Sequence, residues 1–166
     1  MKIKKIFKAE VAHRLVTSYS KRCQSFHGHS YLFEVILESD KLNKDAMLMD
    51  FGEVKKEAGA FLDAFDHTMV LSQDDPFHDR MVAIMHEGNM RWMSVPYNPT
   101  AEMMAVHIYQ QLHEFDLPVK MVVVQETLTG RAYFDGGDDV QDMHVDLDKC
   151  KFSTAITLGT LDGSDA

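Results

Sequence analysis

Two alternating segments near the N-terminus constrain the fold of this chain more than any other feature. In residues 2–13 the odd-numbered positions are apolar, apart from Lys5, and the series ends at His13. In residues 27–37 the odd-numbered positions begin with His27 and His29 and continue with aromatic and aliphatic side chains. Side chains at positions i and i+2 of a strand leave the same face of a sheet. The two segments therefore predict an antiparallel hairpin with one buried face and the histidines near one end of it.

The three imidazoles at the end of this hairpin suggest a metal site. His27 and His29 can reach one ion from the same strand face, and Gly28 leaves the backbone between them uncrowded. His13, with matching parity on the other strand, would be the third ligand. Three protein ligands and an open fourth position are typical of catalytic zinc, although imidazoles also bind nickel, copper and iron. The alternative is structural, because a single histidine on an apolar face is usually a hydrogen-bonded core residue.

Cys23 lies four residues before His27, in a polar and basic segment that is longer than a hairpin turn requires. Its thiol could be a fourth metal ligand, which would make the site closed and structural. Its neighbours Lys21 and Arg22 instead favour a thiolate that abstracts a proton, and we expect this reactive role.

The rest of the chain predicts helices and further strands. Apolar residues recur at helical spacing in two stretches, each preceded by a helix-start signal, and a second pair of apolar strands follows. Residues 72–98 allow no firm assignment. The expected elements are the end of a hairpin at 47–49, a helix from Asp50 to Phe65, a helix from Asn98 to Phe115, and strands at 119–127 and 131–134.

Two further polar groups could belong to a site. Asp66 and His67 follow the first helix, where a histidine is favourable near the helix C-terminus; the same pair could also relay a proton. Glu126 has the parity of the buried face of its strand, so its carboxylate needs a partner. That partner could be an internal Arg or Lys, or the two adjacent N–H donors of a flat ligand such as a pterin or guanine.

Composition restricts the class of protein. The chain has 166 residues and a net charge of −9, which argues against nucleic-acid binding. Cys23 and Cys150 are its only cysteines, so a disulfide framework is not expected. There is no run of apolar residues long enough to cross a membrane, and we expect a cytoplasmic protein of one domain, 1–166. An acidic extension begins at about residue 135, and its spacing does not match a calcium loop.

An ordered set of motifs makes the sequence similar to the family of 6-pyruvoyl-tetrahydropterin and 6-carboxytetrahydropterin synthases. The resemblance covers most of residues 3–134. The motifs that carry it are Ala12-His13, Cys23-x3-His27-Gly28-His29-Ser30-Tyr31, Met49-Asp50-Phe51, Asp66-His67, Pro99-Thr100-Ala101-Glu102 and Glu126-Thr127.

The resemblance implies an α+β tunnelling fold, in which an antiparallel four-stranded sheet carries two helices on one face. Sheets of several subunits join into a barrel, commonly in hexamers. It also implies zinc as cofactor and a pterin as substrate. The implied roles are zinc ligation by His13, His27 and His29, proton abstraction by Cys23, a proton relay in Asp66 and His67, and pterin binding by Glu126 and, more weakly, Thr100.

The three-residue spacer between Cys23 and His27 resembles the bacterial 6-carboxytetrahydropterin synthases of queuosine biosynthesis. These convert 7,8-dihydroneopterin triphosphate and water to 6-carboxytetrahydropterin, acetaldehyde and triphosphate. The alternatives are a pyruvoyl synthase or related lyase reaction, and a non-catalytic pterin- or metal-binding paralogue. Arg14, Lys21 and Arg22 are expected to contact the triphosphate. The chain departs from the family pattern in a longer segment at 74–95 and in about thirty residues after the Glu126 hairpin.

Overall fold

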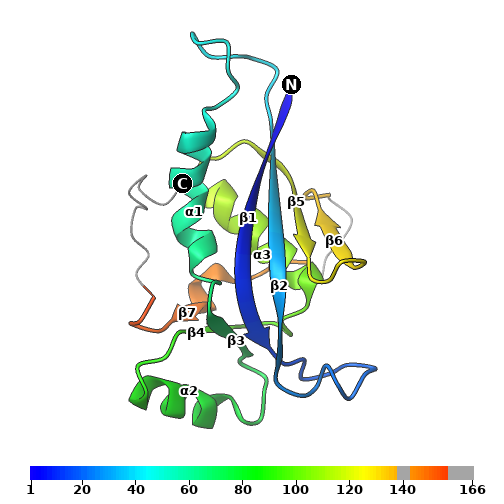
Figure 1. The fold of residues 1–166 in the computed structure, drawn as a ribbon, viewed down its shortest axis with the longest axis vertical. Helices are drawn as coiled ribbons and strands as arrows, with labels where there is room; N and C mark the ends of the chain where they lie inside the picture. The colour runs from blue at the N-terminus through cyan, green and yellow to red at the C-terminus, as the bar shows by residue number, and fades with distance from the viewer. Residues whose placement is uncertain (138–142, 157–166) are drawn as a thin grey trace.

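The computed structural model describes residues 1–137 and 143–156, in which a mixed sheet of seven strands is covered by helices (Figure 1). The strand order is β6-β5-β2-β1-β3-β4-β7. The strands are β1 Lys2–His13, β2 His27–Glu38, β3 Thr68–Ser72, β4 Trp92–Val95, β5 Val119–Gln125, β6 Arg131–Phe134 and β7 Lys151–Phe152.

The predicted hairpin of β1 and β2 is confirmed, and it forms the long axis of the molecule (Figure 1). Its register pairs Val11 with His29 and His13 with His27, so the three histidines lie at the same end of the sheet. β5 pairs with β2, and β6 pairs with β5, both antiparallel. The strands β6-β5-β2-β1 therefore form the antiparallel four-stranded sheet that the family resemblance implies.

The expectation of only four strands and two helices was wrong. β3 lies parallel beside the end of β1, β4 lies parallel beside β3, and β7 pairs antiparallel with β4. These strands have five, four and two residues, too few to show a period of two in the sequence. β4 comes from the unassigned segment and β7 from the C-terminal extension, so both departures from the family pattern enlarge the same sheet, whereas β3 ends where the unassigned segment begins. The expected strand end at 47–49 is also absent, since these residues form irregular structure with bends at 48 and 49.

Three α-helices accompany the sheet. They are α1 Phe51–Asp63, α2 His78–Glu87 and α3 Ala101–Glu114, and a short 3-10 helix spans Leu147–Lys149. α1 and α3 lie on one side of the long hairpin, whereas α2 lies beyond its lower end (Figure 1). Asp50 and Glu53 form the predicted capping box of α1.

The core lies between the sheet and the two helices α1 and α3. Phe33 of β2 meets Phe65, just after α1, with ring centroids 5.3 Å apart, and both side chains are fully buried. His13 is buried with them, at the end of this apolar layer. The hydrophobic core thus ends at the metal-site histidines.

No helix in residues 1–137 and 143–156 is long and apolar enough to cross a membrane. The acidic extension expected from residue 135 is described only in part, since residues 138–142 and the tail from residue 157 lie outside the described residues.

Candidate metal and substrate site

His13, His27 and His29 form a compact cluster at the end of the hairpin. One ligand atom of each residue lies within 4.8 Å of those of the other two. The imidazole centroids are 4.5 Å apart for His13 and His27, 5.0 Å for His27 and His29, and 5.4 Å for His13 and His29. Parity and register thus bring the three rings together as the sequence predicted.

Hydrogen bonds to backbone carbonyls hold two of these rings in the tautomer that can bind a metal. His13 Nδ1 donates to the Pro99 carbonyl and His27 Nδ1 donates to the Ser25 carbonyl, each at 2.8 Å. Each bond fixes the tautomer in which Nε2 carries the lone pair. The His13 Nε2 atom is buried and has no hydrogen-bond partner in the described structure. The three residues therefore fit a metal that accepts imidazole nitrogens.

Burial lowers the pKa of His13 below its ordinary value, and the neighbouring imidazoles His27 and His29 lower it further. The hydrogen bond to Pro99 and the charge of Glu126 oppose this change without reversing it. His13 is thus held as a neutral imidazole, which is the form that binds a metal.

Glu126 lies beside the cluster and is partly exposed. Its Oε1 atom is 3.8 Å from His13 Nε2 and 3.9 Å from His29 Nε2. The Tyr31 hydroxyl donates to the same Oε1 at 2.8 Å. The partner that the sequence required for this carboxylate is therefore a phenol within the protein, rather than the Arg or Lys that we considered.

Tyr31 ends one of the motifs that carry the family resemblance, but the sequence alone predicted no role for it in the site. Burial raises the pKa of its hydroxyl, and the charge of Glu126 and the hydrogen bond to it raise the pKa further. The hydroxyl therefore keeps its proton and acts as a donor. The sequence did indicate this position, because Tyr31 has the same parity as His27 and His29 and is the next side chain on that face of the strand.

Cys23 lies in the loop between β1 and β2 and is half-buried. Its carbonyl accepts a 2.8 Å hydrogen bond from the amide of Leu15, and its thiol is not a member of the histidine cluster. Asn98 fastens the same loop, because its side chain accepts from the Val16 amide at 2.8 Å and donates to the Thr17 carbonyl at 3.0 Å. The segment before α3 thus holds both the loop and His13.

Asp66 and His67 form the expected pair, with His67 Nδ1 2.8 Å from Asp66 Oδ2. Burial acts to raise the pKa of Asp66, but the amide of Glu10, the imidazole of His67 and the charge of Arg91 outweigh it, and the pKa lies below its ordinary value. Asp66 is therefore a carboxylate that orients His67.

This pair lies on the other side of the sheet from the imidazoles of the cluster. His67 lines a pocket of about 290 Å³ together with Glu10, Gly28, His29 and Ser30. Glu10 and Ser30 pair with each other and are hydrogen-bonded, Ser30 Oγ to Glu10 Oε2, at 2.7 Å. Their parity puts them on the sheet face opposite His13 and His29. His67 and the histidine cluster thus lie on opposite faces of the sheet within one subunit.

Thr100 is the N-cap of α3, where its hydroxyl accepts from the amide of Met103 at 3.3 Å.

Arg14, one of three expected triphosphate contacts, forms an ion pair with the buried Asp75 at 3.0 Å, and its side chain is only 17% exposed. Its charge is already neutralised within the protein. Lys21 and Arg22 remain exposed.

Comparison with known proteins shows similarity to one family of enzymes. The model of the family described as 6-pyruvoyl tetrahydropterin synthase matches residues 2–137. A 6-carboxy-5,6,7,8-tetrahydropterin synthase from Aquifex aeolicus is 33% identical over 122 residues, which cover 68% of this chain and 75% of that protein. The protein of the same name from Haemophilus influenzae is 30% identical over 133 residues, covering 77% of this chain and 94% of that protein.

Solved structures share the fold. An uncharacterized protein from Wolinella succinogenes matches with a TM-score of 0.70 and 19% identity, over 82% of this chain and 98% of that one. The 6-pyruvoyl tetrahydropterin synthase of Caenorhabditis elegans matches with a TM-score of 0.60 and 21% identity, over 82% and 96% of the two chains.

Proposed function

The chain belongs to the 6-pyruvoyl tetrahydropterin synthase family, and from this premise we propose that it is a zinc-dependent 6-carboxy-5,6,7,8-tetrahydropterin synthase. It would convert 7,8-dihydroneopterin triphosphate and water to 6-carboxytetrahydropterin, acetaldehyde and triphosphate, a step of queuosine biosynthesis. The observation that carries the proposal is the cluster of His13, His27 and His29 with the carboxylate of Glu126 beside it.

The three imidazoles would hold the zinc. Their donor set suits this ion, and the buried, unpartnered Nε2 of His13 supports the assignment. When bound, zinc supplies a Lewis acid to oxygens of the substrate side chain.

Glu126 would anchor the pterin ring through paired N–H donors of the ligand. Its bond from Tyr31 orients the carboxylate for this task. Thr100 is a second, weaker contact, because a hydroxyl that accepts from Met103 can still donate to a ligand. Lys21 and Arg22 are the remaining basic side chains for the triphosphate.

Cys23 would abstract a proton from the substrate side chain, and His67, oriented by Asp66, would relay protons. Since His67 and the histidine cluster serve opposite sheet faces, we propose that His67 of one subunit completes the site of a neighbouring subunit. A homo-oligomer is required for this arrangement.

Two sheet edges support such an assembly. β1 pairs with β3 only from Val11 to His13, so its part before Val11 has no neighbour on that side within the described residues. β6 is the last strand at the other end of the sheet. Free strand edges pair readily with other strands. We propose that β6 of one subunit pairs with β1 of the next to form a barrel, within a hexamer.

The proposal is tested by incubating zinc-loaded protein with 7,8-dihydroneopterin triphosphate and identifying the products by mass. Acetaldehyde together with a carboxypterin is the expected result. Triphosphate release with a pyruvoylpterin would instead identify the pyruvoyl synthase reaction. Binding of the pterin without turnover would identify a non-catalytic paralogue, and either outcome would contradict the proposed reaction.

A further inference from the structure

The segment between β3 and β4 contacts both the base of the Cys23 loop and the Asp66–His67 pair of its own chain. Its first part meets the base of the Cys23 loop, and its last residue, Arg91, meets Asp66. We propose that residues 75–91 hold the Cys23 loop and the Asp66–His67 pair of each subunit in place, with Asp75 and Arg91 as the positioning residues, although the two groups serve different sites of the proposed assembly. The inference rests on the proposed function.

The contact at the first end is a buried ion pair. Asp75 Oδ2 lies 3.0 Å from Arg14 Nε, and the side chains are 1% and 17% exposed. The other oxygen of Asp75 accepts from the Phe77 amide at 2.8 Å, which fixes the carboxylate. Breaking a buried pair by removing one partner leaves an uncompensated charge, so this contact holds firmly.

Aromatic rings complete the contact. The guanidinium of Arg14 lies 5.5 Å from the ring centre of Phe77 and 5.8 Å from that of Phe26. Arg14 directly follows His13 in the chain, and Phe26 directly precedes His27. The segment therefore contacts Arg14, next to His13, and Arg14 in turn lies over Phe26, next to His27.

The contact at the other end is made by the guanidinium of Arg91. Nε donates to the Asp66 carbonyl at 2.9 Å, and Nη2 donates to the Asp63 carbonyl at 2.7 Å. The Asp63 carboxylate lies 3.5 Å from Nη2. Arg91 thus satisfies the carbonyls at the end of α1 and holds the backbone of the Asp66–His67 pair.

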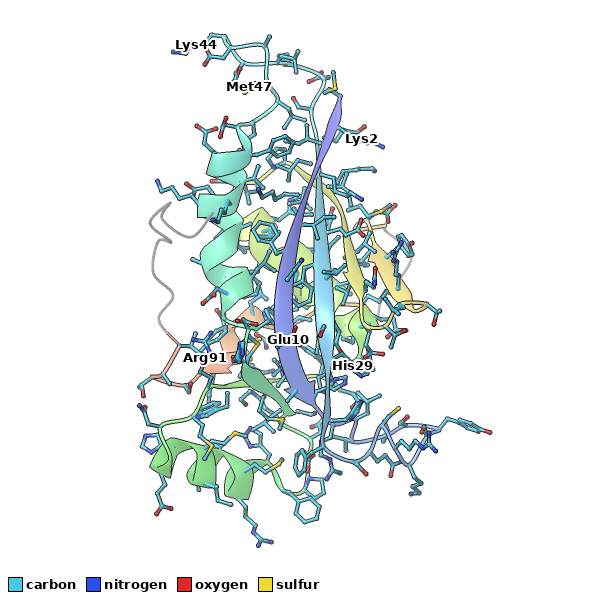
Figure 2. The ribbon with its side chains drawn as sticks, viewed as in Figure 1. Lys2, Glu10, His29, Lys44, Met47 and Arg91 are labelled. Carbon is cyan, nitrogen blue, oxygen red and sulfur yellow. The ribbon has the colours of Figure 1, made fainter. Side chains whose placement is uncertain are left out.

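This backbone needs external support. His67 has a φ of 50°, in the left-handed region that is unfavourable for a side chain with a Cβ atom. Its amide donates to the Glu10 carbonyl at 2.8 Å, and Asp66 Oδ1 accepts from the Glu10 amide at 2.7 Å. Figure 2 labels Arg91, just before β4, and Glu10, on β1, at the same end of the sheet. Arg91 and Glu10 together keep the imidazole in place.

The two ends are joined by ordered structure. His78, the first residue of α2, has Nε2 2.8 Å from the hydroxyl of Ser94 on β4. β4 in turn lies parallel beside β3. A displacement of either end would therefore be transmitted through the helix and strand rather than absorbed by a loose loop.

The test compares Arg91→Gln and Arg91→Lys with Arg80→Gln, and Asp75→Asn with Asp74→Asn. Arg80 and Asp74 lie in or next to the same segment, are exposed, and have no side-chain hydrogen bond or ion pair among the described residues. The measurements are kcat and KM on 7,8-dihydroneopterin triphosphate, hydrogen exchange of the His67 amide by NMR, and the alkylation rate of Cys23.

Arg91→Gln should lower kcat roughly tenfold with KM changed less than about twofold, because misplacement of a catalytic group affects the transition state more than substrate binding. The His67 amide should exchange faster than in wild type. Arg91→Lys keeps the positive charge and a hydrogen-bond donor. It should therefore recover part of the lost kcat and part of the protection of the His67 amide from exchange. Asp75→Asn should change the alkylation rate of Cys23, while both controls match wild type.

Equal kcat and equal His67 exchange in Arg91→Gln and Arg80→Gln would overturn the proposal. If Arg91→Gln does not fold, the same comparison is made with Arg91→Lys. If wild-type protein does not turn over the substrate, the proposed function fails, and the exchange and alkylation measurements decide the positioning role without it.

Discussion

The Tyr31 hydroxyl donates a 2.8 Å hydrogen bond to Oε1 of Glu126, which joins the strand of two metal-site histidines to the residue that follows β5. The same oxygen lies within 4 Å of Nε2 atoms of His13 and His29. The proposed pterin anchor therefore lies next to the histidine cluster, and Tyr31 fixes the oxygen atom that faces it.

Tyr31→Phe should weaken substrate binding while leaving the metal site intact. A hydrogen bond to a charged group contributes about 1.5–3 kcal/mol, so we expect KM to rise by roughly ten- to hundredfold with kcat within about threefold of wild type. Tyr133→Phe is the control, because that hydroxyl belongs to an exposed side chain on β6. An unchanged KM in Tyr31→Phe would show that the phenol does not orient Glu126.

The site was predictable where it follows from strand parity. His13, His27 and His29 share the parity of two long strands, and a period of two over twelve residues specifies the register strongly. The partner of Glu126 was not predictable, because Tyr31 is 95 residues away and pairs with it only through the contact between β2 and β5.

The additional strands were not predictable for a related reason. β3 and β4 are short and buried, and they pair parallel with strands distant in sequence, so no turn signal or alternation marks them. The position of Arg91 at the end of α1 depends on this pairing. Sequence patterns could therefore identify Asp66 and His67 but not the contact of Arg91 with their backbone.

Zinc should stabilise the protein through the three histidines. Binding at about one hundred times the dissociation constant adds about 2.7 kcal/mol, which corresponds to a rise in Tm of roughly 5–10 °C for a chain of this size. His13→Ala should abolish this shift and lower the zinc content measured by atomic absorption. His86→Ala, at an exposed position on α2, should retain both. A zinc-dependent shift that survives in His13→Ala would place the ion elsewhere.

The two cysteines should differ in reactivity. Burial raises the pKa of the Cys150 thiol to about 11, and the charge of Asp146 adds to the effect, so this thiol remains protonated at neutral pH. Iodoacetamide should therefore modify Cys23 first, with loss of turnover but not of zinc. Cys150→Ala should keep activity and Cys23→Ala should lose it. Full activity in Cys23→Ala would remove Cys23 from the mechanism.

His107 should make the fold sensitive to acid. Its burial lowers the pKa to about 4, and its Nδ1 is hydrogen-bonded to the Tyr97 hydroxyl at 2.8 Å. Because the unfolded chain binds the proton near pH 6.5 and the folded chain does not, stability is full above pH 6.5 and is lost as pH falls toward 4. Between pH 7.5 and 5 the loss should be about 2 kcal/mol. Urea unfolding at pH 7.5 and at pH 5 measures this difference in the free energy of unfolding.

The control for this pH effect is the double variant Tyr97→Phe with His107→Leu, which removes both partners of the buried bond. Replacing both avoids an unpaired polar group, so the variant should fold and lose less stability on acidification than wild type. An equal loss in the two proteins would assign the acid sensitivity to other groups.

The proposal that neighbouring subunits share a site makes a sharp prediction for mixtures. Cys23→Ala and His67→Ala should each be inactive. His67 is largely exposed, so its replacement should not disturb the fold. If each site takes Cys23 from one subunit and His67 from a neighbour, mixing the two variants in equal amounts should restore about a quarter of wild-type activity after subunit exchange.

The control mixes wild type with the double variant Cys23→Ala, His67→Ala in equal amounts. Sites formed between subunits again leave about a quarter of the activity after random exchange, whereas sites within one subunit leave about half. Because the two arrangements differ in both mixtures, the pair of measurements separates them without a structure of the assembly. Inactive variants that stay inactive when mixed, together with half activity in the control, would place the whole site in one chain. That result would require the loop of Cys23 or the Asp66–His67 pair to move from the position described here.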